Sequence, residues 1–285
     1  MGTAQFGLDY GISNNQGQVT IEAAKAIMDF AFAQGIHMLD TAIAYGDCEQ
    51  RLGRIGVKDW KVVSKLPEIP SDCKDIDRFV FTSIFESLHR LKIDRLYGLL
   101  LHRPHQLNST NGDILYKSLL QLKCEGVITK IGVSIYEPLE VLNFIDRYPI
   151  DLIQSPFSVL DNRLVDTGGI ALFKSRGIEV HVRSIFLQGL LLMSNHQRPI
   201  QFNRWRSVWD TWHKWLIECG LSPLEACLRH VLKQSQVDGV VVGVTTLEQL
   251  QSILQISADD LFELPSALKC DDRKLINPAN WKNLN

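Results

Sequence analysis

The sequence predicts a parallel (β/α)8 barrel, an α/β fold formed as a single domain over residues 1–285. Three observations lead to this prediction: the length of 285 residues, a regular alternation of short apolar runs with amphipathic segments, and the absence of a glycine-rich phosphate loop. Gly2, Gly7 and Gly11 lack the GxGxxG spacing of an open, doubly wound nucleotide-binding sheet. We therefore prefer the barrel to that sheet.

Seven segments have the short, nearly continuous apolar character of strands buried on both faces. They are Ile36–Asp40, Lys61–Lys65, Arg95–His102, Ile128–Val133, Asp151–Ser155, Ile178–Arg183 and Gly239–Val242. The opening stretch Gly2–Gly7 is expected to supply the missing strand, the first of the eight. Strands and helices alternate without a change of rhythm, which favours parallel pairing through right-handed crossovers.

Apolar residues spaced by three and four positions predict helices between these strands. In the first helix, which begins at Ile21, Thr20 is the expected N-cap and Gly35 the expected stop. Further helical stripes run from Phe81 to Leu91, Leu115 to Leu122 and Leu139 to Ile145, and later helices are expected at Trp205–Cys219, Pro223–Lys233 and Leu247–Ile256. Residues 257–285 are expected to form an irregular tail packed on the barrel.

Composition limits the classes of partner and compartment. The net charge is −2, and charged residues are spread along the chain, so neither nucleic acid nor a membrane is an expected partner. None of the six cysteines forms a CxxC pair, and no apolar run reaches the length of a membrane span. We expect a cytoplasmic protein with reduced thiols, acting as a monomer or a homodimer on a small molecule.

Four polar residues lie where strands end or in the loop just after. Asp40, Lys65 and His102 end three successive predicted strands, and Tyr45 lies in the loop after the first of these. The carboxyl ends of barrel strands meet at one face, with neighbouring strands about 5 Å apart. We therefore expect the four side chains to share one pocket. A metal-dependent barrel is disfavoured, because Lys65 would repel a cation there.

These residue types suit proton donation to a carbonyl oxygen. A tyrosine has an ordinary pKa of about 10 and is a reluctant donor at neutral pH, but a neighbouring lysine ammonium lowers that pKa. An aspartate can hold the lysine in its charged form. A histidine can orient the carbonyl and donate a second hydrogen bond. Together they predict an acid of raised strength beside an oxyanion site.

The segments Asp40-Thr41-Ala42-Ile43-Ala44-Tyr45-Gly46, Ser64-Lys65 and Leu100-Leu101-His102-Arg103-Pro104 resemble the aldo-keto reductase superfamily. The resemblance extends from Gly2 to about Ile256. It implies an oxidoreductase that moves hydride between NAD(P)H and an aldehyde or ketone. It also implies that Tyr45 is the general acid, that Lys65 and Asp40 tune it, and that His102 orients the substrate.

The same resemblance implies a set of cofactor-binding residues. Ser134 and Gln154 stand where the carboxamide is bound, and the stretch beginning Gly189-Leu190 is similar to the loop over the pyrophosphate. The turn from Gly243 through Thr245 to Gln249 is similar to the turn around the adenosine phosphate. The full expected set is Gly2, Thr3, Asp40, Ser134, Gln154, Arg183, Gly189, Leu190, Gly243, Thr245 and Gln249; no metal ligands are expected.

The chain departs from the family pattern at several positions. Ile135 replaces an asparagine, and Arg183 stands where an aromatic ring commonly stacks on the nicotinamide, a role that a planar guanidinium can also fill. Thr245 and Gln249 stand where a basic residue often holds the 2′-phosphate. We therefore expect NADP(H) or NAD(H), with NADP(H) only slightly favoured.

Two functional questions stay open at the level of sequence. The polar loop Arg103–Gly112, which contains His105, favours a hydroxylated substrate such as a sugar or sugar derivative. The alternative to an enzyme is a cofactor-binding barrel that acts as a regulatory or sensing subunit without turnover. The four catalytic residue types favour the enzyme.

Overall fold

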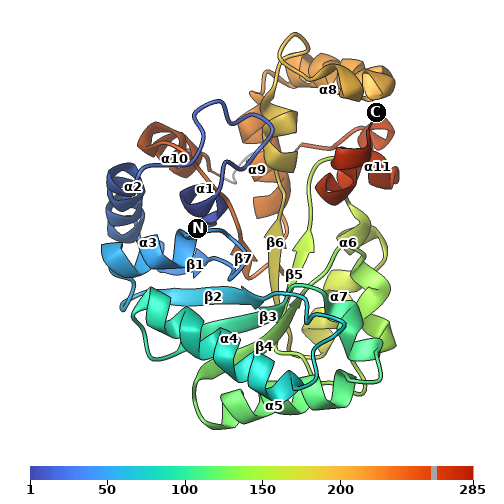
Figure 1. Cartoon of the computed structure of the whole chain (residues 1–285). Helices are drawn as coiled ribbons and strands as arrows, with labels where there is room; N and C mark the ends of the chain where they lie inside the picture. Colours follow the sequence, from blue (N-terminus) through green and yellow to red (C-terminus); the bar gives the residue numbers. More distant parts are fainter. Residues whose placement is uncertain (258–261, 285) are drawn as a thin grey trace.

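The computed structural model describes residues 1–257 and 262–284. Its centre is a curled sheet of seven parallel strands, whose spatial order from β1 to β7 follows the sequence (Figure 1). The strands are β1 (Met38–Asp40), β2 (Lys61–Leu66), β3 (Leu96–Leu101), β4 (Ile128–Ser134), β5 (Leu152–Pro156), β6 (Glu179–Arg183) and β7 (Gly239–Val240). All seven lie within two residues of their predicted bounds, so the strand predictions from 36 onward are confirmed.

The predicted strand Gly2–Gly7 is wrong. Only Gly2 pairs, through isolated parallel bridges to Asp40 beside it on one side and to Gly243 on the other. From Ala4 the chain turns into the short helix α1 (Ala4–Gly7), and Phe6 is buried in the core. The two edges of the sheet therefore meet at a single residue, and the eighth strand of the expected barrel is not formed.

Helices cover the outside of the sheet and alternate with its strands (Figure 1). The α-helices after α1 are α2 (Ile21–Ala33), α3 (Cys48–Ile55), α4 (Ile76–Leu91), α5 (Gly112–Cys124), α6 (Arg163–Asp166), α7 (Gly169–Ser175), α8 (Arg206–Cys219), α9 (Pro223–Leu232), α10 (Leu247–Leu254) and α11 (Arg273–Ile276). The 3-10 helices are η1 (Pro104–Asn108), η2 (Pro138–Asn143), η3 (Leu187–Leu192), η4 (Ile200–Trp205), η5 (Ser266–Leu268) and η6 (Pro278–Asn283).

The helix predictions are confirmed with two differences. The Thr20 hydroxyl accepts a hydrogen bond from the Ala23 amide, and Gly35, with a φ of 81°, follows the end of α2 as expected. The predicted helix from Leu139 is instead the 3-10 helix η2, stabilised by a capping box between Glu137 and Glu140. The helix predicted from Trp205 begins one residue later as α8, after the 3-10 turn η4.

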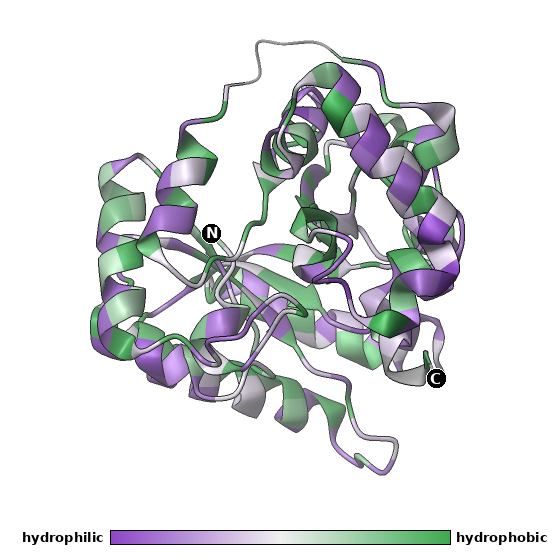
Figure 2. Cartoon of the chain, turned by 90° about the horizontal axis from the view of Figure 1, so that it is seen from above, coloured by the Kyte–Doolittle hydropathy of each residue, from purple (hydrophilic) through white to green (hydrophobic). Residues whose placement is uncertain are grey.

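Apolar side chains form one large cluster between the sheet and its helices and a second one near the tail. The strands are largely hydrophobic, whereas the surrounding helices alternate between hydrophobic and hydrophilic residues (Figure 2). The second cluster joins four tryptophans of η4 and α8 to Leu268, Leu275 and Ile276. Burial of large aromatic rings thus fastens part of the C-terminal tail to the loop after β6. No helix in the described part of the chain has both the length and the apolar character needed to cross a bilayer.

Candidate active site

A cavity of about 900 Å³ opens at the carboxyl ends of the strands. Parallel register brings these ends to one edge of the sheet, with Ser134 beside Gln154 and Asp40 beside Val63. Nearly every residue predicted to act in catalysis or cofactor binding lines this cavity. They are Gly2, Thr3, Asp40, Tyr45, Lys65, His102, Ser134, Gln154, Arg183, Gly189, Gly243, Thr245 and Gln249.

The centre of the site is an ion pair beside a phenol. The Nζ atom of Lys65 donates to both carboxylate oxygens of Asp40 at 2.7 and 2.8 Å, and it lies 3.4 Å from the hydroxyl of Tyr45. Lys65 is 1% exposed. Burial acts to lower the pKa of Lys65, but the charges of Asp40 and Tyr45 outweigh it and raise that pKa above its ordinary value. The lysine is therefore a buried ammonium in contact with the phenol.

Close packing of two glycines holds Tyr45 in place. A Cβ atom on Gly7, at the end of α1, would lie 1.9 Å from the Tyr45 carbonyl oxygen, and one on Gly46 would lie 2.4 Å from the Gly7 oxygen. Gly46 also has a φ of 55°, in the left-handed region that glycine adopts without strain. The turn carrying Tyr45 is thus pressed against α1.

His102 follows β3 and faces the same phenol. The rings of Tyr45 and His102 meet edge-on, with centroids 6.4 Å apart. Burial lowers the pKa of His102 to about 4, and the positive charges of Lys65, Arg103 and Arg183 act in the same direction. His102 is therefore neutral at physiological pH and has a ring N–H to donate.

The side chain of Gln154 fits the carboxamide of a nicotinamide. Its Nε2 atom donates to Asp40 at 2.7 Å, which sets the orientation of the amide because a carboxylate can only accept. Its Oε1 atom is then buried, and no partner for it is present in the described residues. A buried acceptor without a donor is costly. A primary amide entering the cavity beside Ser134 would supply that donor.

Arg183 ends β6 and lies against the loop after β4. Its guanidinium stacks over the ring of Tyr136 at 4.4 Å and donates to the Ile135 carbonyl at 2.9 Å and to the Ser184 hydroxyl at 3.2 Å. Ile135, at the position of the expected asparagine, thus contributes its backbone oxygen. One face of the guanidinium is taken by Tyr136, and Arg183 still lines the cavity.

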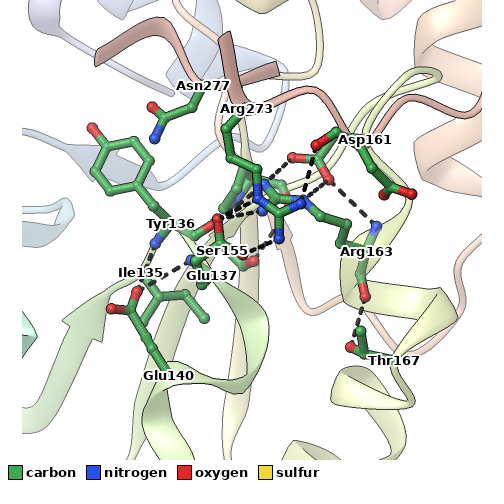
Figure 3. A network of polar contacts seen from close by, with 12 residues as sticks. Ile135, Tyr136, Glu137, Glu140, Ser155, Asp161, Arg163, Thr167, Arg273 and Asn277 are labelled. Carbon is green, nitrogen blue, oxygen red and sulfur yellow. Dashed lines mark hydrogen bonds and ion pairs between the residues drawn. The ribbon is translucent and has the colours of Figure 1, made fainter. Parts of the chain in front are cut away.

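The C-terminal tail fixes this wall of the cavity. Figure 3 shows Arg163 and Arg273 converging on Glu137, the residue after Tyr136. The Nη1 atom of Arg163 lies 2.6 Å from a Glu137 oxygen, and Arg273 donates to both Glu137 oxygens. Glu140 accepts from the Tyr136 amide at 2.8 Å. Tail, loop and cavity wall therefore form one polar network.

The loop after β6 places one predicted residue in the cavity and one outside it. Gly189 lines the cavity with a φ of 90°, and its neighbour Gln188 contacts Tyr10 and Ser13 of the loop after α1. Leu190 does not line the cavity, because its side chain is buried in the second apolar cluster. The position of this side chain therefore does not support the prediction that Leu190 contacts the cofactor.

The turn after β7 occupies the far end of the cavity. A Cβ atom on Gly243 would lie 2.4 Å from the Oε1 atom of Gln5, so a larger residue there would displace the Gln5 side chain. Gln249 folds back and accepts hydrogen bonds from the Thr245 amide at 2.8 Å and its hydroxyl at 3.2 Å. Local hydrogen bonds with the side chains of Thr246 and Gln249 thus occupy backbone amides at the start of α10.

The sequence matches a known protein family over most of its length. The sequence profile of the Aldo/keto reductase family matches residues 1–264, which is most of the chain. The chain belongs to the aldo/keto reductase family. Members of this family use NAD(P)H in general, so generic oxidoreduction is the activity that the relationship supports.

Individual relatives of this reductase are distant. The chain is 25% identical over 254 residues to the uncharacterized oxidoreductase YqkF of Bacillus subtilis, covering 81% of each protein. It is 24% identical over 310 residues to a D-threo-aldose 1-dehydrogenase of a Pseudomonas species, covering 94% of this chain and 93% of that protein. The holo form of aldo-keto reductase AKR11C1 from Bacillus halodurans superposes with a TM-score of 0.70 at 22% identity, over 100% of this chain and 90% of that one. This likeness shows the fold.

Three further histidine and cysteine residues do not line the cavity of about 900 Å³. His105 is 3.5 Å from Glu68 and lines a separate cavity of about 660 Å³ between the loops after β2 and β3. His37 packs against Phe32 just before β1, at the opposite end of the strand from Asp40. Cys48 is buried, and burial raises the pKa of its thiol. The described residues contain no group of three or more His, Cys, Asp and Glu side chains that could hold a metal ion.

Sequence reasoning missed several residues that line the cavity. Tyr10, Tyr136, Gln188 and Glu248 all do so. Glu248 carried a usable signal, since it lies in the first turn of a helix whose start was predicted. Tyr10 and Tyr136 lie in loops, and Gln188 lies at a non-helical kink inside η3. No periodicity indicates which way a side chain points at such positions.

Proposed function

We propose that this reductase transfers hydride between NAD(P)H and an aldehyde or ketone, with Tyr45 as the general acid. The bound dihydronicotinamide supplies the hydride. The observation that carries the proposal is the position of Lys65, whose ammonium contacts Asp40 at 2.7 Å and the Tyr45 hydroxyl at 3.4 Å. A buried cation beside a phenol stabilises the phenolate that remains after proton donation.

Each residue of the centre then has a defined task. Tyr45 donates its hydroxyl proton to the carbonyl oxygen as negative charge develops there. Lys65 stabilises the resulting phenolate, and Asp40 keeps the lysine charged. Lys65 also donates to the Thr41 carbonyl at 3.0 Å, which holds the ammonium at this position. These contacts are preformed, so little reorganisation is needed during the reaction.

His102 orients the substrate. Because its pKa is lowered to about 4, the ring carries one N–H and one bare nitrogen at neutral pH. The N–H is free to donate to the same carbonyl oxygen as Tyr45. Two donors converging on one oxygen favour the geometry in which the carbonyl carbon faces the hydride.

Gln154, Ser134 and Arg183 hold the nicotinamide end of the dinucleotide in this proposal. The unpaired Oε1 of Gln154 accepts from the carboxamide. The planar guanidinium of Arg183, braced by Tyr136, supplies the flat surface that an aromatic ring commonly offers. Gly2, Thr3, Gly189, Gly243, Thr245 and Gln249 line the path toward the adenosine end.

A sugar or sugar derivative is the substrate class that we favour. The loop Arg103–Gly112 is polar, and Arg103 lines the cavity next to His102. Arg103 is the residue of this loop that lines the cavity, and its guanidinium would donate hydrogen bonds to substrate hydroxyl groups there. Other polar residues of the loop line the separate cavity of about 660 Å³. A relative that acts on an aldose by name, the D-threo-aldose 1-dehydrogenase, supports the same class.

The Tyr45→Phe variant tests the proposal. It should lower kcat/KM for a panel of aldoses and short aldehydes by about 10²- to 10⁴-fold, because the general acid is lost. The dissociation constant for the coenzyme should change by less than about twofold, since the phenyl ring fills the same space. The matched control is Tyr116→Phe on α5, whose hydroxyl contacts only the Pro149 backbone and which should keep full activity.

Two outcomes would count against this assignment. Full activity in Tyr45→Phe would show that Tyr45 is not the general acid. Tight coenzyme binding without turnover of any carbonyl by the unaltered protein would favour the alternative, a regulatory or sensing barrel.

A further inference from the structure

Glu49 is a buried carboxylate that lies behind the catalytic centre and does not line its cavity. It belongs to the first turn of α3 and is 2% exposed. Its Oε1 atom accepts hydrogen bonds from the hydroxyl groups of Ser64 at 3.0 Å and Ser87 at 2.6 Å. Its Oε2 atom accepts two hydrogen bonds from the guanidinium of Arg90, at 2.9 and 2.7 Å. One side chain thus joins α3 to β2 and to α4.

This side chain also connects the two segments that carry the acid and its lysine. Ser64 precedes Lys65 on β2, and successive side chains of a strand point to opposite faces. The Ser64 hydroxyl therefore faces α3, while the Lys65 ammonium faces the cavity. The amide of Cys48, the residue before Glu49, donates to the Tyr45 carbonyl at 3.0 Å. A short path of hydrogen bonds and peptide bonds thus runs from Tyr45 through Glu49 to Lys65.

The stability of the fold gives little reason for a carboxylate at this position. Taking such a group out of water is costly, and apolar side chains that replace a buried ion pair often leave stability unchanged or raise it. A carboxylate that accepts four directed hydrogen bonds instead restricts its partners to one arrangement, because these bonds weaken steeply when they bend. The contribution specific to Glu49 is therefore the fixed arrangement of α3, β2 and α4.

We propose that Glu49 is a positioning residue, whose contact with Ser64 holds β2 at a fixed distance from the turn that carries Tyr45. The distance that matters is the 3.4 Å between the Lys65 Nζ atom and the Tyr45 hydroxyl. When β2 moves away, the ammonium stabilises the developing phenolate less, since their attraction falls with distance. Proton donation is also sensitive to displacements of about 1 Å. The inference rests on the proposed function, because it takes Tyr45 as the general acid.

The two serines provide a matched pair of variants. Both are fully buried and donate to the same Glu49 oxygen, but Ser64 adjoins Lys65 whereas Ser87 lies on α4. Ser64→Ala and Ser87→Ala should lower the midpoint of urea denaturation by similar amounts, since each removes one donor from a buried acceptor. Ser64→Ala should in addition lower kcat for reduction of a short aldehyde about fivefold or more, whereas Ser87→Ala should keep kcat within about twofold. Equal effects on kcat would overturn the inference, because a purely structural carboxylate does not distinguish between its two donors.

Replacement of the ion pair should have a larger effect. The double variant Glu49→Leu with Arg90→Leu removes both charges, so no unpaired ion remains to unfold the protein. It should lower kcat about twentyfold or more, while KM for the aldehyde and the dissociation constant for the coenzyme change less than about threefold. Glu49→Gln keeps an acceptor for Ser64 and should hold kcat within about fivefold of the unaltered protein. A loss spread equally over kcat, KM and coenzyme binding would contradict a positioning role.

Tyr45→Phe separates this inference from the proposed function. If Tyr45→Phe keeps full activity, the proposed function fails and the inference fails with it. If Tyr45→Phe is inactive but Ser64→Ala and the double variant both keep kcat unchanged, the inference alone fails. An inactive Tyr45→Phe, together with a kcat that falls from Ser87→Ala through Ser64→Ala to the double variant, supports both.

Discussion

His102 should stay neutral far below the pH at which an ordinary imidazole takes up a proton. Burial lowers its pKa from 6.5 to about 4, with Lys65 and Arg103 acting in the same direction. That difference corresponds to about 3 kcal/mol in favour of the neutral ring. At pH 5, about a tenth of His102 should be protonated in the folded protein, whereas nearly all of an unperturbed histidine would be.

NMR titration of the histidine ring protons from pH 7.5 to 3.5 measures this directly, with His102→Asn used to assign the signal. Arg103→Gln should raise the midpoint by only a few tenths of a pH unit, because burial is the larger cause. The kcat/KM for carbonyl reduction should show no loss from His102 between pH 7 and 5. A midpoint near 6.5 in the folded protein would refute the reasoning from burial and neighbouring cations.

Three further substitutions test the contacts described above. Lys65→Met should lower the free energy of unfolding by about 3 kcal/mol or more, since Asp40 loses its buried partner. Urea denaturation at pH 7 measures this free energy. The double variant with Asp40→Asn should recover part of the loss. Gly7→Ala should lower kcat at least tenfold in a protein with unchanged circular dichroism, because the new Cβ displaces Tyr45. Burial lowers the pKa of His230 from 6.5 to about 4, so the stability that it contributes above pH 6.5 is lost as pH falls toward 4. The loss is about 2 kcal/mol in the free energy of unfolding at pH 5. His230→Gln should therefore reduce the difference in unfolding free energy between pH 7.5 and pH 5 by about this amount. An unchanged difference would contradict the lowered pKa of His230.

The seven strands and most of the longer helices after residue 20 were predicted because their signals are local, whereas α3, α6, α7 and α11 were not. Periodic burial marks each amphipathic helix, and short apolar runs mark strands covered on both faces. Asp40, Lys65 and His102 stood out because polar side chains follow apolar runs. In a parallel sheet, residues at strand ends share one edge wherever they lie in the sequence. The sequence therefore predicted the parallel α/β architecture and the meeting of these strand-end residues in one cavity, but not the loss of the eighth strand.

Other features were decided by contacts between distant segments. The residues from Ala4 to Gly7 form a helix because they pack against the Tyr45 loop, and Leu190 joins an apolar cluster with the tail. The stacking of Arg183 on Tyr136 and the free oxygen of Gln154 likewise depend on neighbours across the sheet. Periodicity reports whether a residue is buried, but not which residue it meets. Only the tertiary structure brings those partners, and their charges, together.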